Sequence, residues 1–140
     1  MIWNKKSHIF KVDGNFGWMH SHAQVPFGYL VDSNTLRIYY ATRDKINRCV
    51  ATFIDVDPSD PSKIKYIHGD ICLGLGKIGM FDERGAMISC VVEHQNLLYM
   101  YYTGWNIGVD TPYRLSIGIA VSDDGGITFK RYSDGPIMDR

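Results

Sequence analysis

The sequence has almost no helical periodicity, and this absence narrows the possible folds at once. No stretch of about a dozen residues places apolar side chains at the three-and-four spacing of an amphipathic helix, so strands must supply the core. Long apolar runs are also missing. The first eighteen residues alternate apolar and charged side chains, a pattern of neither a signal peptide nor a membrane span. We therefore expect an all-β protein that does not enter a membrane.

The chain also lacks net charge and a cysteine framework. Its 15 basic and 15 acidic residues give a formal charge of zero, so the electrostatic footprint of a nucleic-acid-binding protein is absent. Cys49, Cys72 and Cys90 form no CxxC pair and are odd in number, which favours reduced thiols in the cytoplasm. Without clustered ligands we expect no metal site, and we expect no cofactor.

One strand-rich pattern occurs twice, roughly sixty residues apart. The first copy runs VPFGYLV, DSNT, LRIYYATRD and RCVATFIDVDPSDP; the second runs ISCVV, EHQN, LLYMYYTGWN and RLSIGIAVSDDGGITFKRY. Tyr39-Tyr40 matches Tyr101-Tyr102, and Arg48 matches Arg114. A repeat of this length, made of four short strands, is typical of a blade of a β-propeller.

The repeat predicts an incomplete propeller ring of about two four-stranded antiparallel blades. The expected strands of the first blade are residues 24–31, 36–42, 48–56 and 64–67, and those of the second are 87–93, 97–103, 114–121 and 128–132. Residues 3–11 are expected to form an opening strand. The resulting organisation is an opening strand and linker (1–19), first blade (20–68), connecting loop (69–85), second blade (86–133) and the start of a next connection (134–140).

Two motifs are interpreted as structural. Residues 74–79 spell G-x-G-x-x-G, but no helical pattern follows, so a loop between blades is expected rather than a dinucleotide site. Residues 122–129 match the S-x-D-x-G-x-T-[FW] hairpin known as the Asp-box. In it the Ser and Asp side chains satisfy turn amides and glycine supplies positive φ, so we assign the motif no catalytic role.

Acidic residues stand directly before the first strand of the second blade. Asp82 and Glu83 are expected to point toward the central well of the ring, where a sugar can lie between acids from different blades. Glycoside hydrolysis needs two carboxyl groups facing the scissile bond, and either residue can be one of them. The alternative is a solvated loop.

The matching entry of the first blade carries His22 and Gln24, which alternate with Ala23 and are therefore both expected to face the well. Imidazole and amide groups suit hydrogen bonds to sugar hydroxyls, although a purely structural histidine is the alternative.

Four further candidates follow the second strand of each blade: Arg43 and Asp44 in the first, Trp105 and Asn106 in the second. Arg43 and Asp44 either contact a ligand or pair with each other. Trp105 is either a stacking platform for a sugar or packs against the next blade.

With these segments in view, the chain resembles the five-bladed β-propeller glycosidase superfamily of the arabinanase, levansucrase and invertase type. It is most similar to uncharacterised propeller proteins of bacterial surface-polysaccharide gene clusters. The resemblance is carried by residues 21–26, 39–44, 81–85, 98–106 and 119–126. It implies acids on successive inner strands, of which Asp82 most nearly matches that of the second blade, with Glu83 as its rival. The first-blade position holds His22 and Gln24 instead, and the later acid has no counterpart.

The resemblance also implies a function and a partner. The chain matches the N-terminal half of such a propeller, so a second copy or a second chain is expected to supply the missing blades. The implied function is that of a glycosidase-like hydrolase acting on, or binding, a bacterial polysaccharide or oligosaccharide. The alternatives are a non-catalytic carbohydrate-binding or assembly module and an inactive fragment of a split propeller.

Overall fold

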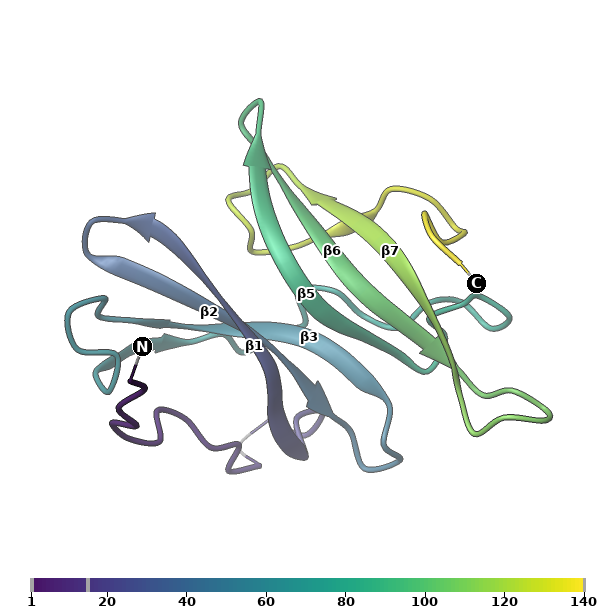
Figure 1. Ribbon diagram of the computed structural model, residues 1–140, viewed down its shortest axis with the longest axis horizontal. Helices are drawn as coiled ribbons and strands as arrows, with labels where there is room; N and C mark the ends of the chain where they lie inside the picture. Colours follow the sequence, from purple (N-terminus) through teal and green to yellow (C-terminus); the bar gives the residue numbers. More distant parts are fainter. Residues whose placement is uncertain (1, 15, 140) are drawn as a thin grey trace.

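The computed structural model describes residues 2–14 and 16–139, and its regular structure is entirely β (Figure 1). The strands are β1 (Ser21–Asp32), β2 (Thr35–Arg43), β3 (Cys49–Val56), β4 (Ile64–Ile67), β5 (Gly85–His94), β6 (Leu97–Asn106), β7 (Arg114–Ser122) and β8 (Lys130–Arg131). Within these two ranges no helix is long and apolar enough to cross a bilayer. The predicted all-β class is confirmed.

The strands form two antiparallel, four-stranded units that have the layout of propeller blades. β1 to β4 pair in chain order in the first blade, and β5 to β8 do so in the second. A single parallel pair, Cys49 with Gly85, joins β3 to β5. Figure 1 shows the two blades spreading apart from this junction. Because backbone pairing between the blades is so slight, side-chain packing must hold them together.

That packing is a core built from both blades. On β6, Leu98, Met100 and Tyr102 are buried, and the residues between them are partly exposed. This alternation is the period of two that a half-buried strand requires. The buried side chains of β6 face the first blade, where Tyr39 and Phe53 belong to the same hydrophobic core cluster.

The turn between β7 and β8 fastens the second blade to the first. Ser122 Oγ accepts the Gly126 amide at 2.8 Å, and Asp124 Oδ1 accepts the Ile127 amide at 3.0 Å. Tyr39 of the first blade donates a hydrogen bond from its Oη to the carbonyl of Gly126 in this turn, at 2.8 Å. Partial burial alone would raise the pKa of Asp124, but hydrogen bonds from Ser122 and Thr128 hold it well below its usual range.

A buried ion pair, Arg37 with Asp55, supports the same turn. Arg37 binds Asp55 through two hydrogen bonds of 2.8 and 2.9 Å and also donates to the Gly125 carbonyl at 3.0 Å. The Arg37 guanidinium lies 3.8 Å above the ring of Phe53, whose other contacts include the stacked ring of His68 at 4.3 Å.

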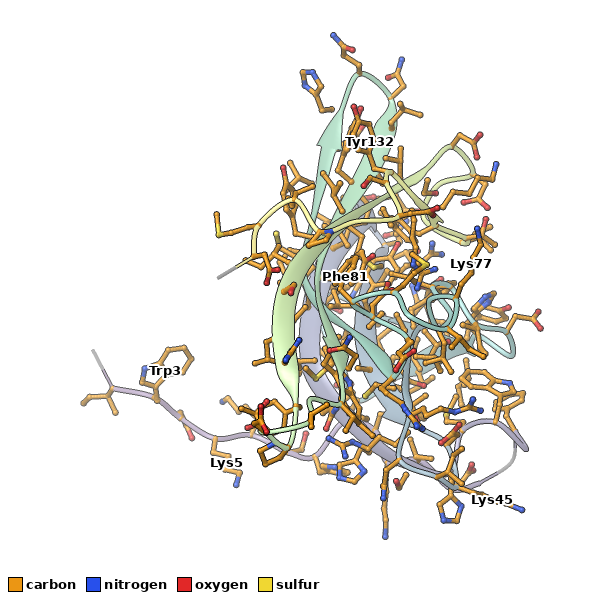
Figure 2. The ribbon with its side chains drawn as sticks, turned by 90° about the vertical axis from the view of Figure 1, so that its right-hand side faces the viewer. Trp3, Lys5, Lys45, Lys77, Phe81 and Tyr132 are labelled. Carbon is orange, nitrogen blue, oxygen red and sulfur yellow. The ribbon has the colours of Figure 1, made fainter. Side chains whose placement is uncertain are left out.

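The predicted opening strand at residues 3–11 is wrong, since the structure has no strand there. Within the described ranges no strand pairs with the backbone of this segment. Trp3 is 90% exposed and projects away from the blades (Figure 2). Further along, Phe10 packs on Tyr40 with ring centroids 5.4 Å apart. Together with Phe16 and Met19 it covers the outer face of the first blade.

The corresponding face of the second blade is not covered in this way. It consists of alternate residues of β6 and β7, which pair as Tyr99 with Val121, Tyr101 with Ile119, Thr103 with Ile117 and Trp105 with Leu115. All of them are partly exposed, and Leu115 reaches 44%. We call this surface the open face.

The G-x-G-x-x-G segment lies in the connection between the blades. Residues 74–79 are irregular backbone and turn, and the described residues after them, 80–84, form turns rather than a helix. The predicted loop is therefore confirmed, and the conformation required of a dinucleotide site is absent from it.

Candidate functional site

Both inner strands start at the same edge of the molecule. In Figure 1, β1 and β5 rise together from the lower side. Strand register places Ser21 opposite Arg43 and Gly85 opposite Trp105, so β2 and β6 end where β1 and β5 begin. We call this the entry edge. It gathers the predicted site residues from two distant parts of the sequence.

A pocket of about 360 Å³ lies at this edge, where the blades meet. Arg43 of the first blade lines it together with Met87, Trp105, Tyr113 and Leu115 of the second. Register explains three of them: Trp105 pairs with Leu115, and Met87 pairs with Thr103, which places the side chains of Met87, Trp105 and Leu115 on one face of the sheet. Two of the predicted ligand contacts, Arg43 and Trp105, are therefore brought together.

The position of Trp105 depends on a glycine. Its indole lies so close to Gly85 that a Cβ at that position would be 1.9 Å from Nε1. The Nε1 atom is buried and has no hydrogen-bond partner within the described part of the chain. Only glycine permits such a close approach of ring and backbone.

Arg43 has an unusual environment for a cation. It is half-buried, and its Nε is sealed from solvent without a hydrogen-bond acceptor among residues 2–14 and 16–139. It lies beside the Cys49 thiol, whose Sγ also accepts a hydrogen bond from Gln24 Nε2 at 3.1 Å. Burial raises the pKa of Cys49, and the Arg43 charge opposes that rise.

His22 and Gln24 do not point the same way, so the alternation expected of them is wrong. Gln24 is half-buried and its Nε2 lies 3.7 Å from Met87 Sδ, next to the pocket. His22 is exposed, with Nδ1 2.9 Å from Ser21 Oγ. The reason is irregular backbone: the register of β1 shifts on both sides of Gln24, and His22 has φ 64°.

Asp44 organises a turn and does not pair with Arg43. Its Oδ1 accepts the amides of Ile46 at 3.0 Å and Arg48 at 2.9 Å, and its Oδ2 accepts Arg48 Nε at 2.8 Å. Partial burial alone would raise the pKa of Asp44, but these hydrogen bonds lower it. Of the two alternatives for this pair, mutual pairing is wrong, because Arg48 satisfies the carboxylate.

Asp82 is 0% exposed and lies inside the second blade. Its Oδ2 accepts hydrogen bonds from Tyr102 Oη at 2.9 Å and Arg131 Nε at 2.7 Å, and Arg131 also donates to the Gly74 carbonyl at 2.6 Å. The carboxylate thus faces β8 and the connecting loop, and the expectation that it points into the central well is not met. Together with burial, its charge raises the pKa of Tyr102.

Glu83 and Asn106 close the loop in front of β5. Glu83 is half-buried, and its Oε2 accepts the Gly79 amide at 2.6 Å. Asn106 Nδ2 donates to the Met80 carbonyl at 3.5 Å. Glu83 is therefore the one of the two predicted acids whose side chain keeps access to solvent.

Three pocket residues were missed by the sequence predictions: Met87, Tyr113 and Leu115. Strand alternation was a usable signal for two of them, because Met87 and Leu115 share a face with Trp105. Tyr113 lies in the loop before β7, where no periodicity applies. A further link between the inner strands, Tyr29 Oη to Glu93 Oε2 at 2.9 Å, also had no signal in the sequence. Within the described ranges no group of three metal-ligating side chains comes together.

Comparison with known proteins places the fold but not the activity. Two proteins of Mycobacterium tuberculosis, "Uncharacterized protein Rv1502" of strain H37Rv and "Uncharacterized protein MT1551" of strain CDC 1551, are 36% identical over 138 residues. The match covers 99% of this chain and 46% of each relative, so the chain spans about half the length of the curated relatives it matches. No family model matches the sequence.

Among solved structures, the chain is similar to Zg3597, a family 117 glycoside hydrolase of the marine bacterium Zobellia galactanivorans. The TM-score is 0.66 over 90% of this chain and 36% of that chain, with 18% sequence identity. At this identity the match shows a shared fold. It bears out the coarser part of the predicted resemblance, a propeller-type fold of the kind that glycosidases use.

Proposed function

We propose that this chain binds carbohydrate at the entry edge, in the pocket lined by Arg43, Trp105 and Tyr113. The observation that carries the proposal is the pocket itself: an arginine from one blade faces two aromatic residues from the next. Its 360 Å³ falls within the range of about 300–1,000 Å³ usual for small-molecule sites.

The side chains suit a sugar chemically. A sugar ring has one face rich in C–H groups, which packs on flat aromatic surfaces such as those of Trp105 and Tyr113. Its hydroxyls take hydrogen bonds from guanidinium and amide groups, which Arg43 and the neighbouring Gln24 carry. His22, Asp44 and Asn106 stay in the proposal as residues at the rim of the same edge.

Hydrolysis is the second candidate function, favoured by the fold shared with a glycoside hydrolase. Glycosidases of this general kind use two carboxyl groups roughly 5–10 Å apart on either side of the bond. Glu83 is the better placed of the predicted acids, because Asp82 is buried and bound to Arg131. We propose that any hydrolytic activity belongs to an assembly with further blades that supply the second acid.

The open face supports a partner of that kind. Tyr99, Tyr101 and Ile119 form a partly exposed apolar surface on the second blade, and one more blade packed there would bury them. We propose that a second copy or a second chain provides it. The three cysteines are free thiols, which fits the proposed cytoplasmic location.

Glycan binding tests the function directly. We expect the chain to bind a subset of glycans on an array, and Trp105→Ala to lose that binding. Trp3→Ala is the matched control, since Trp3 is exposed and lies far from the entry edge (Figure 2). If wild type binds no glycan, or if both variants bind as wild type does, the proposed site is wrong.

Hydrolysis and assembly need separate measurements. Release of reducing ends from any glycan that binds tests hydrolysis, and Glu83→Gln should abolish it if Glu83 is the acid. Light scattering tests assembly: we expect an oligomer that Ile119→Lys dissociates, whereas Ile127→Lys, which changes an exposed turn residue, leaves it intact. A well-folded wild-type monomer contradicts the proposed partner.

A further inference from the structure

We infer that the pocket at the entry edge is specific for acidic sugars, those that carry a carboxylate, over neutral ones. The inference rests on the proposed carbohydrate binding and names the class of sugar. It is carried by the state of Arg43 and by the charges around it.

Arg43 is a cation without an anionic partner. No carboxylate in the described part of the chain lies within ion-pair distance of it, because the nearest in sequence, Asp44, is taken by Arg48 at 2.8 Å. Its Nε is buried without an acceptor. Apart from its contact with the Cys49 thiol, a half-buried guanidinium in this state has given up part of its hydration without gaining a counter-charge, so an anion reaching it is favoured.

Other arginines lie along the same edge. Arg48 and Arg84 stand directly before β3 and β5, and Arg114 begins β7, so together with Arg43 four arginines occupy neighbouring strand ends. Of these four arginines, only Arg48 has an ion pair with another described residue. Carboxylates also lie along this edge or its loops: Asp44, bound to Arg48; Asp82, bound to Arg131; and Glu83, Asp110 and Asp139. The preference therefore rests on Arg43, the one of the four arginines that lines the pocket.

The pocket offers separate binding groups for the carboxylate and for the ring of such a sugar. A guanidinium offers parallel N–H groups that match the two oxygens of a carboxylate, a fit that a hydroxyl cannot reproduce. Arg43 comes from the first blade, and Trp105 and Leu115 come from the second. A uronate can thus bind Arg43 of the first blade through its carboxylate and pack its ring on the second blade, so the pocket recognises both the charge and the ring.

The test uses a glycan array of matched pairs: galacturonate with galactose oligosaccharides, glucuronate with glucose oligosaccharides, and sulfated and phosphorylated forms of the neutral members. We expect the wild type to prefer the uronates, and Arg43→Gln to lower its affinity for them about tenfold or more. Arg114→Gln is the control, since it removes an equal charge outside the pocket lining, and its effect should be several times smaller. Circular dichroism checks that each variant is folded.

The outcomes separate this inference from the function on which it rests. Binding of neutral glycans as tightly as their uronate partners overturns the acidic preference and leaves carbohydrate binding intact. Equal losses in the Arg43 and Arg114 variants also overturn it, because general charge then explains the effect. Stronger binding of sulfated or phosphorylated glycans than of uronates shows that the anion is not a carboxylate. Absence of any binding removes both proposals.

Discussion

Among single substitutions at the entry edge, Asp82→Ala should cause the largest loss of stability in the second blade. The carboxylate is fully buried and accepts Tyr102 Oη at 2.9 Å and Arg131 Nε at 2.7 Å. Its removal leaves the hydroxyl of Tyr102 buried without a partner and leaves the Arg131 guanidinium, whose side chain is 18% exposed, without its counter-charge.

The expected magnitude follows from this geometry. Removing one partner of a buried ion pair costs about 3–5 kcal/mol, and the partial exposure of Arg131 favours the lower value, about 3 kcal/mol. For a chain of 140 residues this corresponds to a fall in Tm of roughly 10–15 °C. Tyr102→Phe removes only one hydrogen bond to the same carboxylate and should cost about 1–2 kcal/mol.

Thermal and urea unfolding measure these differences, with Glu83→Ala as the control. Glu83 is half-buried, and Glu83→Ala removes one hydrogen bond to the Gly79 amide, so the free energy of unfolding should fall by less than about 1 kcal/mol. An Asp82→Ala protein that melts within about 2 °C of wild type would refute the reasoning. If Asp82→Asn instead keeps full stability and abolishes glycan hydrolysis, the residue is catalytic rather than structural.

Three further predictions concern other parts of the fold. Gly126→Ala should destabilise the protein by about 1–3 kcal/mol in urea, because φ is +82° there and a Cβ would lie 2.0 Å from Tyr39 Oη; an unchanged midpoint contradicts this. Gly85→Ala should displace Trp105, shift its fluorescence and weaken glycan binding, since a Cβ would lie 1.9 Å from Nε1; an unchanged spectrum contradicts it. Burial lowers the pKa of His68, so its contribution to stability is complete above about pH 6.5 and is lost as the pH falls below it. His68→Phe should therefore flatten the change of Tm between about pH 5 and pH 7.5, and a parallel curve counts against the assignment.

Local patterns in the sequence were enough to predict the strands. The predicted 64–67 coincides with β4, and the other strands differ from prediction by a few residues at their ends. β8 is shorter than the predicted 128–132, because the amide and hydroxyl of Thr128 bind Asp124 and not a neighbouring strand. The segment 3–11 has the alternation of a strand but pairs with no strand in the described ranges, and alternation alone does not reveal whether a segment will pair.

The site was harder to predict, because its side chains depend on contacts distant in sequence. Asp82 sits in an acidic run that suggests solvent, and its partner Arg131 lies 49 residues away with no pattern to connect them. Bulges around Gln24 turned His22 outward, which strand alternation does not foresee. Arg43 and Trp105 were placed correctly at one edge, because both follow the second strand of a repeated unit.

The slight connection between the blades has a consequence for recognition. Apart from one pair of residues at the Cys49–Gly85 junction, the relative tilt of the blades is set by side-chain packing and by the 122–129 turn gripping Tyr39 and Arg37. The residues that would hold a sugar belong to different blades, so the width of the pocket depends on the angle between the blades. A substitution in the 122–129 turn, which contacts none of the pocket residues, should therefore change that angle and weaken binding.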